Sequence, residues 1–282
     1  MQAKTVLLDS LDTRWKKFRS ELKTCRKEFS EEAVHDLRVS TRRLLATCDL
    51  LRSITPHKRI QKIRRALKDQ LDDLDDLRDV QVLLTDASEF MSEIPELKAL
   101  QTHWLQEEKS LMKHTRKLVK ERDTKGLSKR IEKTREMLSD LPEENLAEQI
   151  LAAVDEAYAH VLQTYAALDA ENIPSIHKLR IAFKRFRYSV EIVHPLLADF
   201  PSANFERMHG YQSRMGDIQD MEVARQKLTE VNPASNLNLE TVSNHYALRL
   251  QTAVRTFFED KGEALVFWRS LPHQSFPWEK SS

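Results

Sequence analysis

The sequence predicts an all-α protein built from two related halves. Only 4 of its 282 residues are glycine, and strands, tight turns and phosphate-binding loops all depend on that residue. Apolar residues recur at spacings of three and four along almost the whole chain, which is the pattern of helices that bury one face. The segment that begins at His35 also returns at His177. Long helices in a duplicated arrangement account for all three observations.

Prolines and glycines divide this pattern into separate helices. The breaks lie at Pro56, Pro95, Gly126, Pro142, Pro174, Pro201 and Pro233. We therefore expect helices over residues 3–28, 31–54, 57–91, 95–122, 126–140, 143–169, 175–197, 202–230 and 235–259, with a short one near 261–270. Ser30 and Ser175 are expected to cap the two repeated helices, because a serine oxygen accepts hydrogen bonds from the free N–H groups at a helix start. Short breaks between long helices favour antiparallel bundles.

The charge balance limits the classes of ligand. With 45 Lys and Arg against 44 Asp and Glu, the formal net charge is only +1. This excludes a protein that binds nucleic acid through bulk positive charge, so any anion site requires charges to be segregated on the surface. The Gly-rich loops that hold the phosphates of nucleotides are missing from the sequence.

The cysteines and the hydropathy pattern indicate the compartment. Cys25 and Cys48 lie inside helical patterns and lack the spacing of a metal site or a disulfide framework, so we expect core residues in a reducing compartment. No apolar stretch approaches the roughly 18 residues of a membrane-spanning helix, and the first residues lack a signal-peptide pattern. The sequence predicts a soluble cytoplasmic protein.

The repeated segment gives each half a helix with one cationic side. The two copies read HDLRVSTRRL and HKLRIAFKRF. In the first copy, His35, Arg38 and Arg42 fall on one side of a helix and apolar residues fall on the other. The second copy places a histidine, an arginine and a lysine at the same positions. Solvation alone does not require this repetition, so a site for an anion is favoured over a basic face that only contacts water.

A second repeated element follows each cationic helix. Asp76 and Asp79 correspond to Asp217 and Asp220, and both pairs have the spacing Asp-x-x-Asp on a long helix. We expect these carboxylates to hold arginines of the facing helix in place, in preference to binding a metal ion.

The first half has an additional row of cations. Lys58, Lys62 and Arg65 are spaced four and three apart, so they share one face of their helix. At the positions of Lys62 and Arg65 the second half has Ala203 and Glu206. We therefore expect the cationic surface to be stronger in the first half.

The repeated pattern H-x-L-R-[VI]-x-x-[KR]-R-[LF], followed in each half by [LI]-x-D-[VM]-x-V, resembles the CHAD domain family, the conserved histidine α-helical domain. The resemblance covers nearly the whole chain. It implies two antiparallel four-helix bundles related by a pseudo-twofold axis in one compact unit, here residues 1–140 and 141–282. It also implies binding of inorganic polyphosphate on a basic groove or channel lined by the repeated helices. The chain leaves no room for a triphosphate-processing domain, so it resembles a stand-alone member.

The resemblance also implies which residues contact the ligand. By motif position these are His35, Arg38, Arg42, Arg43, His177, Arg180, Lys184 and Arg185. Helical geometry adds Lys58, Lys62, Arg65 and Arg187. Arginine suits phosphate because its planar donors match two oxygens at once. The change from Arg42 to Lys184 keeps the charge but loses this geometry, so the two halves are not expected to contribute equally.

We expect inorganic polyphosphate, or granules of it, as the partner of a protein that binds without catalysis and uses no cofactor or metal. Aromatic residues interleaved with the basic rows are sparse. A sequence-specific nucleic acid is therefore not expected as a partner, and neither is a membrane.

A metal enzyme is the alternative interpretation. Asp72–Asp76 matches the DDxxD pattern that binds magnesium-bridged diphosphates, and Glu32 with His35 has the ExxH spacing of di-iron bundles. Neither pattern recurs at the equivalent position of the other half. The alternative function is a metal-dependent enzyme that acts on polyphosphate or a diphosphate substrate through the Asp-rich helix 69–79.

Overall fold

The computed structural model describes residues 2–231 and 239–281. In these residues the chain forms long helices and no strand, so the predicted all-α class is confirmed. The helices are α1 (Ala3–Glu28), α2 (Glu31–Ile54), α3 (Lys58–Phe90), α4 (Leu97–Glu121), α5 (Lys125–Ser139), α6 (Leu146–Ala166), α7 (Ile173–Val193), α8 (Ala203–Glu230) and α9 (Glu240–Asp260). Short 3-10 helices are η1 (His194–Leu196), η3 (Lys261–Val266) and η4 (Pro277–Ser281).

Most helix boundaries agree with the proline and glycine pattern. The helices α1 and α2 have the predicted limits. The Ser30 hydroxyl accepts a hydrogen bond from the Ala33 N–H at 3.2 Å, which confirms it as the N-cap of α2. The predicted break at Pro233 and the predicted helix start at residue 235 lie outside the described residues.

The predicted cap of the second repeated helix is wrong. The helix α7 begins before Ser175 and includes Pro174 in its first turn, where a missing N–H costs nothing. The Ser175 hydroxyl instead accepts a hydrogen bond from the Asp169 N–H and donates one to the Asp169 carbonyl, both at 3.1 Å. It therefore fastens the loop before α7 rather than starting the helix.

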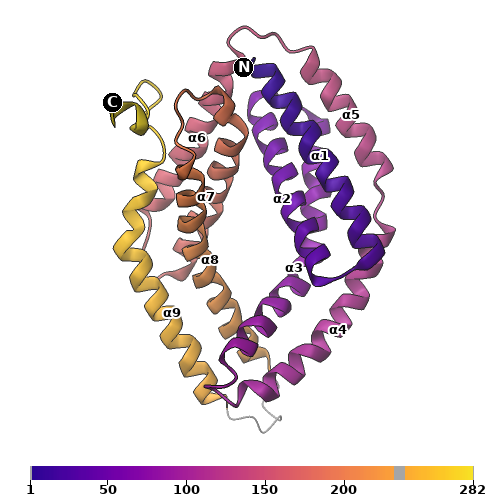
Figure 1. Cartoon of the computed structure of the whole chain (residues 1–282), viewed down its shortest axis with the longest axis vertical. Helices are drawn as coiled ribbons and strands as arrows, with labels where there is room; N and C mark the ends of the chain where they lie inside the picture. Colours follow the sequence, from indigo (N-terminus) through magenta and orange to yellow (C-terminus); the bar gives the residue numbers. More distant parts are fainter. Residues whose placement is uncertain (1, 232–238, 282) are drawn as a thin grey trace.

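Four helices of each half correspond in order. The repeated histidine motif lies on α2 and α7, and the Asp-x-x-Asp spacing lies on α3 and α8. The flanking helices α1 and α4 then correspond to α6 and α9, whereas α5 has no counterpart in the described part of the second half and packs on α1 and α3. Figure 1 shows the two halves facing each other across an opening.

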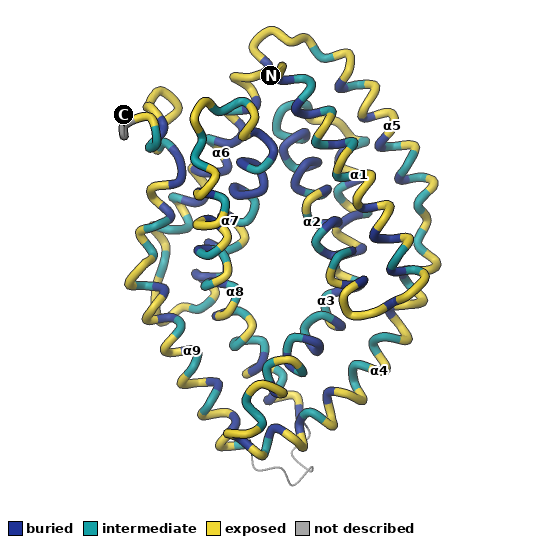
Figure 2. Tube along the Cα trace, viewed as in Figure 1, coloured by how far each residue is buried: buried dark blue, intermediate teal, exposed yellow. Residues whose placement is uncertain are grey.

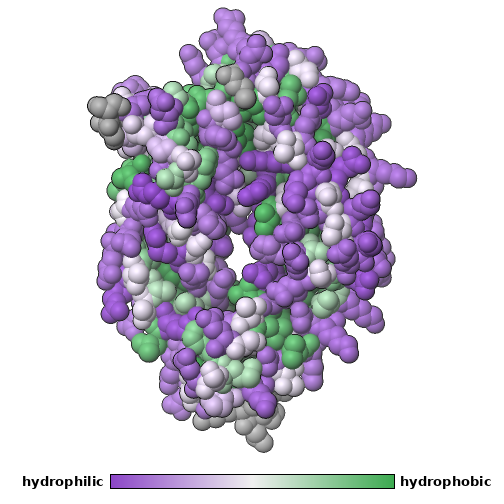
Figure 3. All heavy atoms as spheres, in the orientation of Figure 1, coloured by the Kyte–Doolittle hydropathy of each residue, from purple (hydrophilic) through white to green (hydrophobic). Residues whose placement is uncertain are grey.

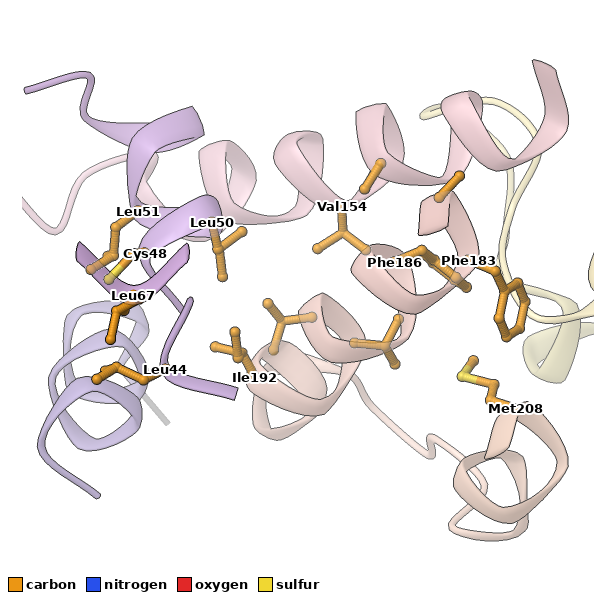
Figure 4. Packing of buried hydrophobic residues seen from close by; sticks show 14 of the residues in the cluster. Leu44, Cys48, Leu50, Leu51, Leu67, Val154, Phe183, Phe186, Ile192 and Met208 are labelled. Atoms are coloured by element: carbon orange, nitrogen blue, oxygen red, sulfur yellow. The ribbon is translucent and has the colours of Figure 1, made fainter. Parts of the chain in front are cut away.

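Two apolar clusters join the halves. The larger one runs through both bundles and connects them where α2 packs on α6 and α7, around Leu50, Val154 and Ile192 (Figure 4). The smaller one joins α3 and α4 to α8 and α9 and includes the buried rings of Trp104 and Tyr246. Burial of each large apolar side chain stabilises the fold by about 1.5–3 kcal/mol. Buried segments accordingly lie on the facing sides of the helices and exposed ones on the outside (Figure 2).

A polar channel remains between these two junctions. In Figure 3 an opening passes through the molecule, and hydrophilic side chains border most of it, with hydrophobic ones at its lower rim. The helices α2 and α3 lie on one side of the opening and α7 and α8 on the other (Figure 1). Because the apolar faces of these helices are buried in the bundle cores, polar faces are left to line the channel.

The two cysteines lie in the protein core. Cys25 and Cys48 are free thiols buried in the core, as predicted. Burial raises the pKa of Cys25 to about 11 and that of Cys48 to about 12, so neither is a ready nucleophile at neutral pH.

In the described part of the chain, none of the helices has a stretch that is both long and apolar enough to cross a bilayer.

Candidate functional site

Cations from both repeated helices gather in the channel. Arg42 on α2 lies close enough to Arg38 and Arg180 for their charges to lower its pKa, which burial also lowers, to about 10. Lys184 on α7 is affected by the same arginines and by Arg187. These five residues are called the channel cluster below. All five lie on α2 and α7, the helices that border the opening on either side (Figure 1).

Lys184 has the most perturbed pKa of this cluster. Burial, together with the charges of Arg42, Arg180 and Arg38, lowers its pKa to about 6. The charges that act on it are all positive. At neutral pH most of the Lys184 amines are therefore uncharged in the free protein, and an anion in the channel would favour the charged form.

Arg38 is the structural member of the cluster. It is buried, and its Nη1 donates to Oδ1 of Asp75 at 2.5 Å and to the carbonyl of Leu71 at 3.5 Å. Its direct partner is therefore Asp75, one residue before the predicted Asp76. Asp79 also lies near Arg38, and burial and the charge of Asp75 raise its pKa. The predicted residues Asp76 and Asp79 are wrong as direct partners of this arginine, which α3 holds through Asp75 instead.

In the described part of the structure, the corresponding carboxylates of the second half are not in direct contact with arginines. Burial raises the pKa of Asp220, while attraction to Arg180 and Arg78 opposes this shift. Asp217 lies near Arg249 and Arg180 in the same way. Neither carboxylate forms an ion pair within 4.0 Å in the described residues. The predicted role of these two residues is thus limited to attraction over a longer distance.

The acidic residues form a separate section of the channel wall. Asp217 and Asp220 line a cavity of about 320 Å³ with Asp86, Glu89 and Arg249, below the channel cluster. Among the described residues, no three carboxylate, imidazole or thiol groups converge as a metal site requires. The Asp-rich segment of α3 places its carboxylates beside arginines and does not gather them around one point.

A second cavity, called the mouth pocket, adjoins the channel cluster and takes cations from both halves. Its volume is about 640 Å³. The charged and titratable side chains that line it are Arg14, Lys17, Arg43, Arg187, Glu191, His194, Glu206 and His209. Arg187 belongs both to this pocket and to the groups that act on Lys184. Two of the predicted residues, Arg43 and Arg187, thus extend the cationic surface from the channel to its mouth.

Arg14 is a member of this site that the repeated motif does not reveal. It comes from α1, and its Nη1 donates to Thr47 Oγ1 at 3.0 Å and to the Arg43 carbonyl at 3.3 Å. Burial lowers its pKa to about 10, and the charge of Arg43 adds to this shift while Glu191 opposes it. The sequence carries a signal for it, because Arg14 occupies the helical stripe of the buried residues Leu11 and Phe18.

In the described residues, three buried nitrogen atoms of α7 have no hydrogen-bond partner. They are Nε of Arg180, Nε of Arg187 and Nδ1 of His177. A buried polar atom without a partner costs about 1–3 kcal/mol. The Arg187 guanidinium is also paired with Glu191 at 3.5 Å, so Arg180 is the arginine of this set that has no ion pair within the described residues.

The remaining predicted residues lie apart from the cluster. His35 is exposed near the start of α2, and Arg185 is half-buried on α7. Lys58, Lys62 and Arg65 are exposed on α3, and in the described residues no contact joins them to the channel cluster. The expectation that the first half binds more strongly stays a prediction.

Comparisons with known proteins agree with this architecture. No match was found among curated proteins. The crystal structure of the CHAD domain from the plant Ricinus communis superposes with a TM-score of 0.75 and 19% sequence identity, over 96% of this chain and 93% of that chain. At this identity the likeness shows the fold. The family model for the CHAD domain matches residues 9–229. Since this match spans well over half of the sequence, the chain belongs to the CHAD domain family.

Proposed function

We propose that this protein binds inorganic polyphosphate in the channel between its halves and does not act on it chemically. The observation that carries the proposal is the group of cations from both halves, in which Arg42 of α2 and Lys184 of α7 lie near Arg38 and Arg180. Phosphate oxygens are strong acceptors for arginine. A bound polyanion would offset the mutual repulsion of the channel cluster.

The regularity of the site suits a regular polymer. Each internal phosphate of polyphosphate carries about one negative charge, and no sequence has to be read. Cations from two facing helices offer several contacts to the same kind of group along the chain. Binding should release counterions and weaken steeply with salt, as it does for nucleic-acid backbones.

The groups beside the channel cluster support binding without turnover. Asp75 is engaged by Arg38, and the pKa values of both cysteines are raised by burial. Hydrolysis of a phosphoanhydride requires an activated nucleophile or a metal-bound water. A cytoplasmic location, in association with polyphosphate granules, follows as part of the same proposal.

The proposal is tested by titration of long-chain polyphosphate at two salt concentrations. The variant Arg42→Ala/Arg180→Ala should bind roughly a hundredfold more weakly, because it loses two charge-assisted contacts. The matched variant Lys62→Ala/Arg65→Ala removes the same charge from the exposed face of α3. Comparison of the two variants should show whether the channel cluster or the cations of α3 bind the ligand. Equal affinity of the channel variant and the wild type would overturn the assignment. Release of phosphate from polyphosphate in the presence of magnesium would overturn the non-catalytic role.

A further inference from the structure

Helix α1 carries cations on two sides. On the side of α2, Arg14 and Lys17 line the mouth pocket. On the other side, where α5 packs on α1, Lys16 lines a separate cavity together with Arg19 and Lys23. Figure 1 shows α1 between α2 and the outer helix α5. Two cationic cavities are thus separated only by the width of one helix.

The outer cavity is a groove of about 590 Å³ with a basic row along it. Lys16, Arg19, Lys23 and Arg26 are spaced three, four and three apart on α1, so they follow one face of the helix. Hydroxyl-bearing residues of α5 and of the loop before it complete the lining. At a rise of about 1.5 Å per residue the row extends for roughly 15 Å. It is therefore an elongated site, suited to a chain rather than to a single ion.

The cations of this row are available to a ligand. Lys16 and Lys23 are exposed, and the structure gives their side chains no ion pair or hydrogen bond in the described residues. Arg19 lies over the ring of Trp15 at 5.9 Å from its centre. Arg26 anchors the groove, since its guanidinium donates to the carbonyls of Val119 and Arg122 at 3.0 and 2.6 Å. In the described residues, three of the four cations thus have no ion pair, while Arg26 is held in place by two carbonyls.

We propose that a polyphosphate chain leaving the channel through the mouth pocket crosses α1 and continues along this outer groove, so that long chains occupy a second site that short chains do not reach. The inference rests on the proposed function of the channel. Lys16 and Lys17 are consecutive residues that line different cavities, so the two cavities adjoin the same turn of α1, where Lys17 pairs with Glu21 at 2.6 Å. Joining the two sites on one polymer raises the overall affinity without any new contact in the channel.

The groove favours a chain of phosphates over the other polyanions. Single-stranded nucleic acid binds basic grooves by stacking its bases on aromatic faces. Trp15 is the aromatic residue that lines this groove, and its ring already stacks on Phe18 at 5.5 Å and lies below Arg19. A bare phosphate chain needs only the charges. It would draw Arg19 from the indole, and this movement gives an optical signal.

The experiment compares tripolyphosphate with long-chain polyphosphate on the full chain. The outer variant is Lys16→Ala/Arg19→Ala/Lys23→Ala. It should bind tripolyphosphate as the wild type does, and it should bind the long chain more weakly, with a salt slope reduced by about 2 for three lost contacts. The control variant Lys98→Ala/Arg225→Ala/Arg255→Ala removes three exposed cations that line neither cavity and should leave both ligands unaffected.

A fluorescence titration gives a second readout. Long-chain polyphosphate should change the tryptophan emission of the wild type, and Trp15→Phe should abolish this change. The inference would be overturned if the outer variant bound the long chain with the affinity and salt slope of the wild type. It would also be overturned if the outer variant lost affinity for single-stranded RNA but not for long-chain polyphosphate. Tripolyphosphate tests the channel proposal separately. If Arg42→Ala/Arg180→Ala binds this short ligand as tightly as the wild type does, the channel proposal is wrong.

Discussion

The Nη1 atom of Arg38 lies 2.5 Å from Oδ1 of Asp75, so the first arginine of the repeated motif is tied to α3. Its counterpart Arg180 has no ion pair within the described residues, and its buried Nε lacks a hydrogen-bond partner. Two residues at equivalent positions therefore have different tasks. Arg38 joins two helices, whereas Arg180 is left without an ion pair in the described residues.

Removal of the Arg38 guanidinium should lower the stability of the fold. Arg38→Ala deletes a buried partner of Asp75 and of the Leu71 carbonyl, and the expected loss is about 2 kcal/mol in the free energy of unfolding. Arg180→Ala, which breaks no ion pair, should cost much less. Urea denaturation of both variants measures the difference. Equal midpoints for the two variants would show that the Asp75 contact carries no stability.

The sequence predicts the fold because its signals are local. Proline and glycine positions mark the helix ends, and the three-and-four spacing of apolar residues marks the buried faces. The error at Ser175 arises from a choice between two caps that a single sequence does not resolve, since Pro174 is equally compatible with a helix start. The repeat shows which helix of one half corresponds to which helix of the other, and it therefore indicates that the two halves have the same arrangement of helices.

The candidate site is predicted only in part, because it depends on contacts across the channel. The repeated motif identifies Arg42, Arg180 and Lys184, which the structure brings together. It does not identify Arg14, which belongs to α1 and reaches the mouth pocket only after the halves have packed. A helical row such as Lys58, Lys62 and Arg65 gives a shared face without telling which neighbour that face meets. Tertiary contacts supply this information.

The affinity for polyphosphate should rise as the pH falls from about 8 toward 6. In the free protein the pKa of Lys184 is about 6, and a bound polyanion raises it, so binding takes up a proton in this range. Lys184→Arg, which is charged throughout, should bind with little dependence on pH. Calorimetry in two buffers with different ionisation enthalpies measures the proton uptake. No uptake at pH 7 in the wild type would contradict the assignment.

The stability of the free protein should change in the opposite direction with pH. The folded-state pKa of Lys184, about 6, lies below the ordinary lysine value of 10.5, so the unfolded chain binds more protons between these values. Stability therefore rises with pH through this window. Lys184→Met should be less dependent on pH than the wild type when urea midpoints are compared at pH 6.5 and pH 9. A slope that is the same in both proteins would be the contrary result.

The junction at the acidic end of the channel should depend on Asp86. Its carboxylate accepts a hydrogen bond from the Tyr246 hydroxyl at 2.7 Å and pairs with Arg249 at 2.8 Å, which connects α3 to α9. Asp86→Ala leaves both donors without this acceptor. Because the ion pair is partly exposed, we expect a loss of about 2 kcal/mol. Thermal unfolding tests the stability, and faster amide exchange in α9 than in α6 would localise the effect to this junction.

Arg14 should contribute to polyphosphate binding although it lies outside the repeated motif. It is half-buried at the mouth pocket beside Arg43, and its charge persists at neutral pH because its pKa of about 10 is well above that range. Arg14→Ala should weaken binding and reduce the salt slope by about 0.7 for one lost contact. Lys98→Ala is the matched control, since Lys98 is an exposed cation that lines neither cavity. If the Lys98 variant loses as much affinity as the Arg14 variant, general surface charge rather than the position of Arg14 determines binding at the mouth.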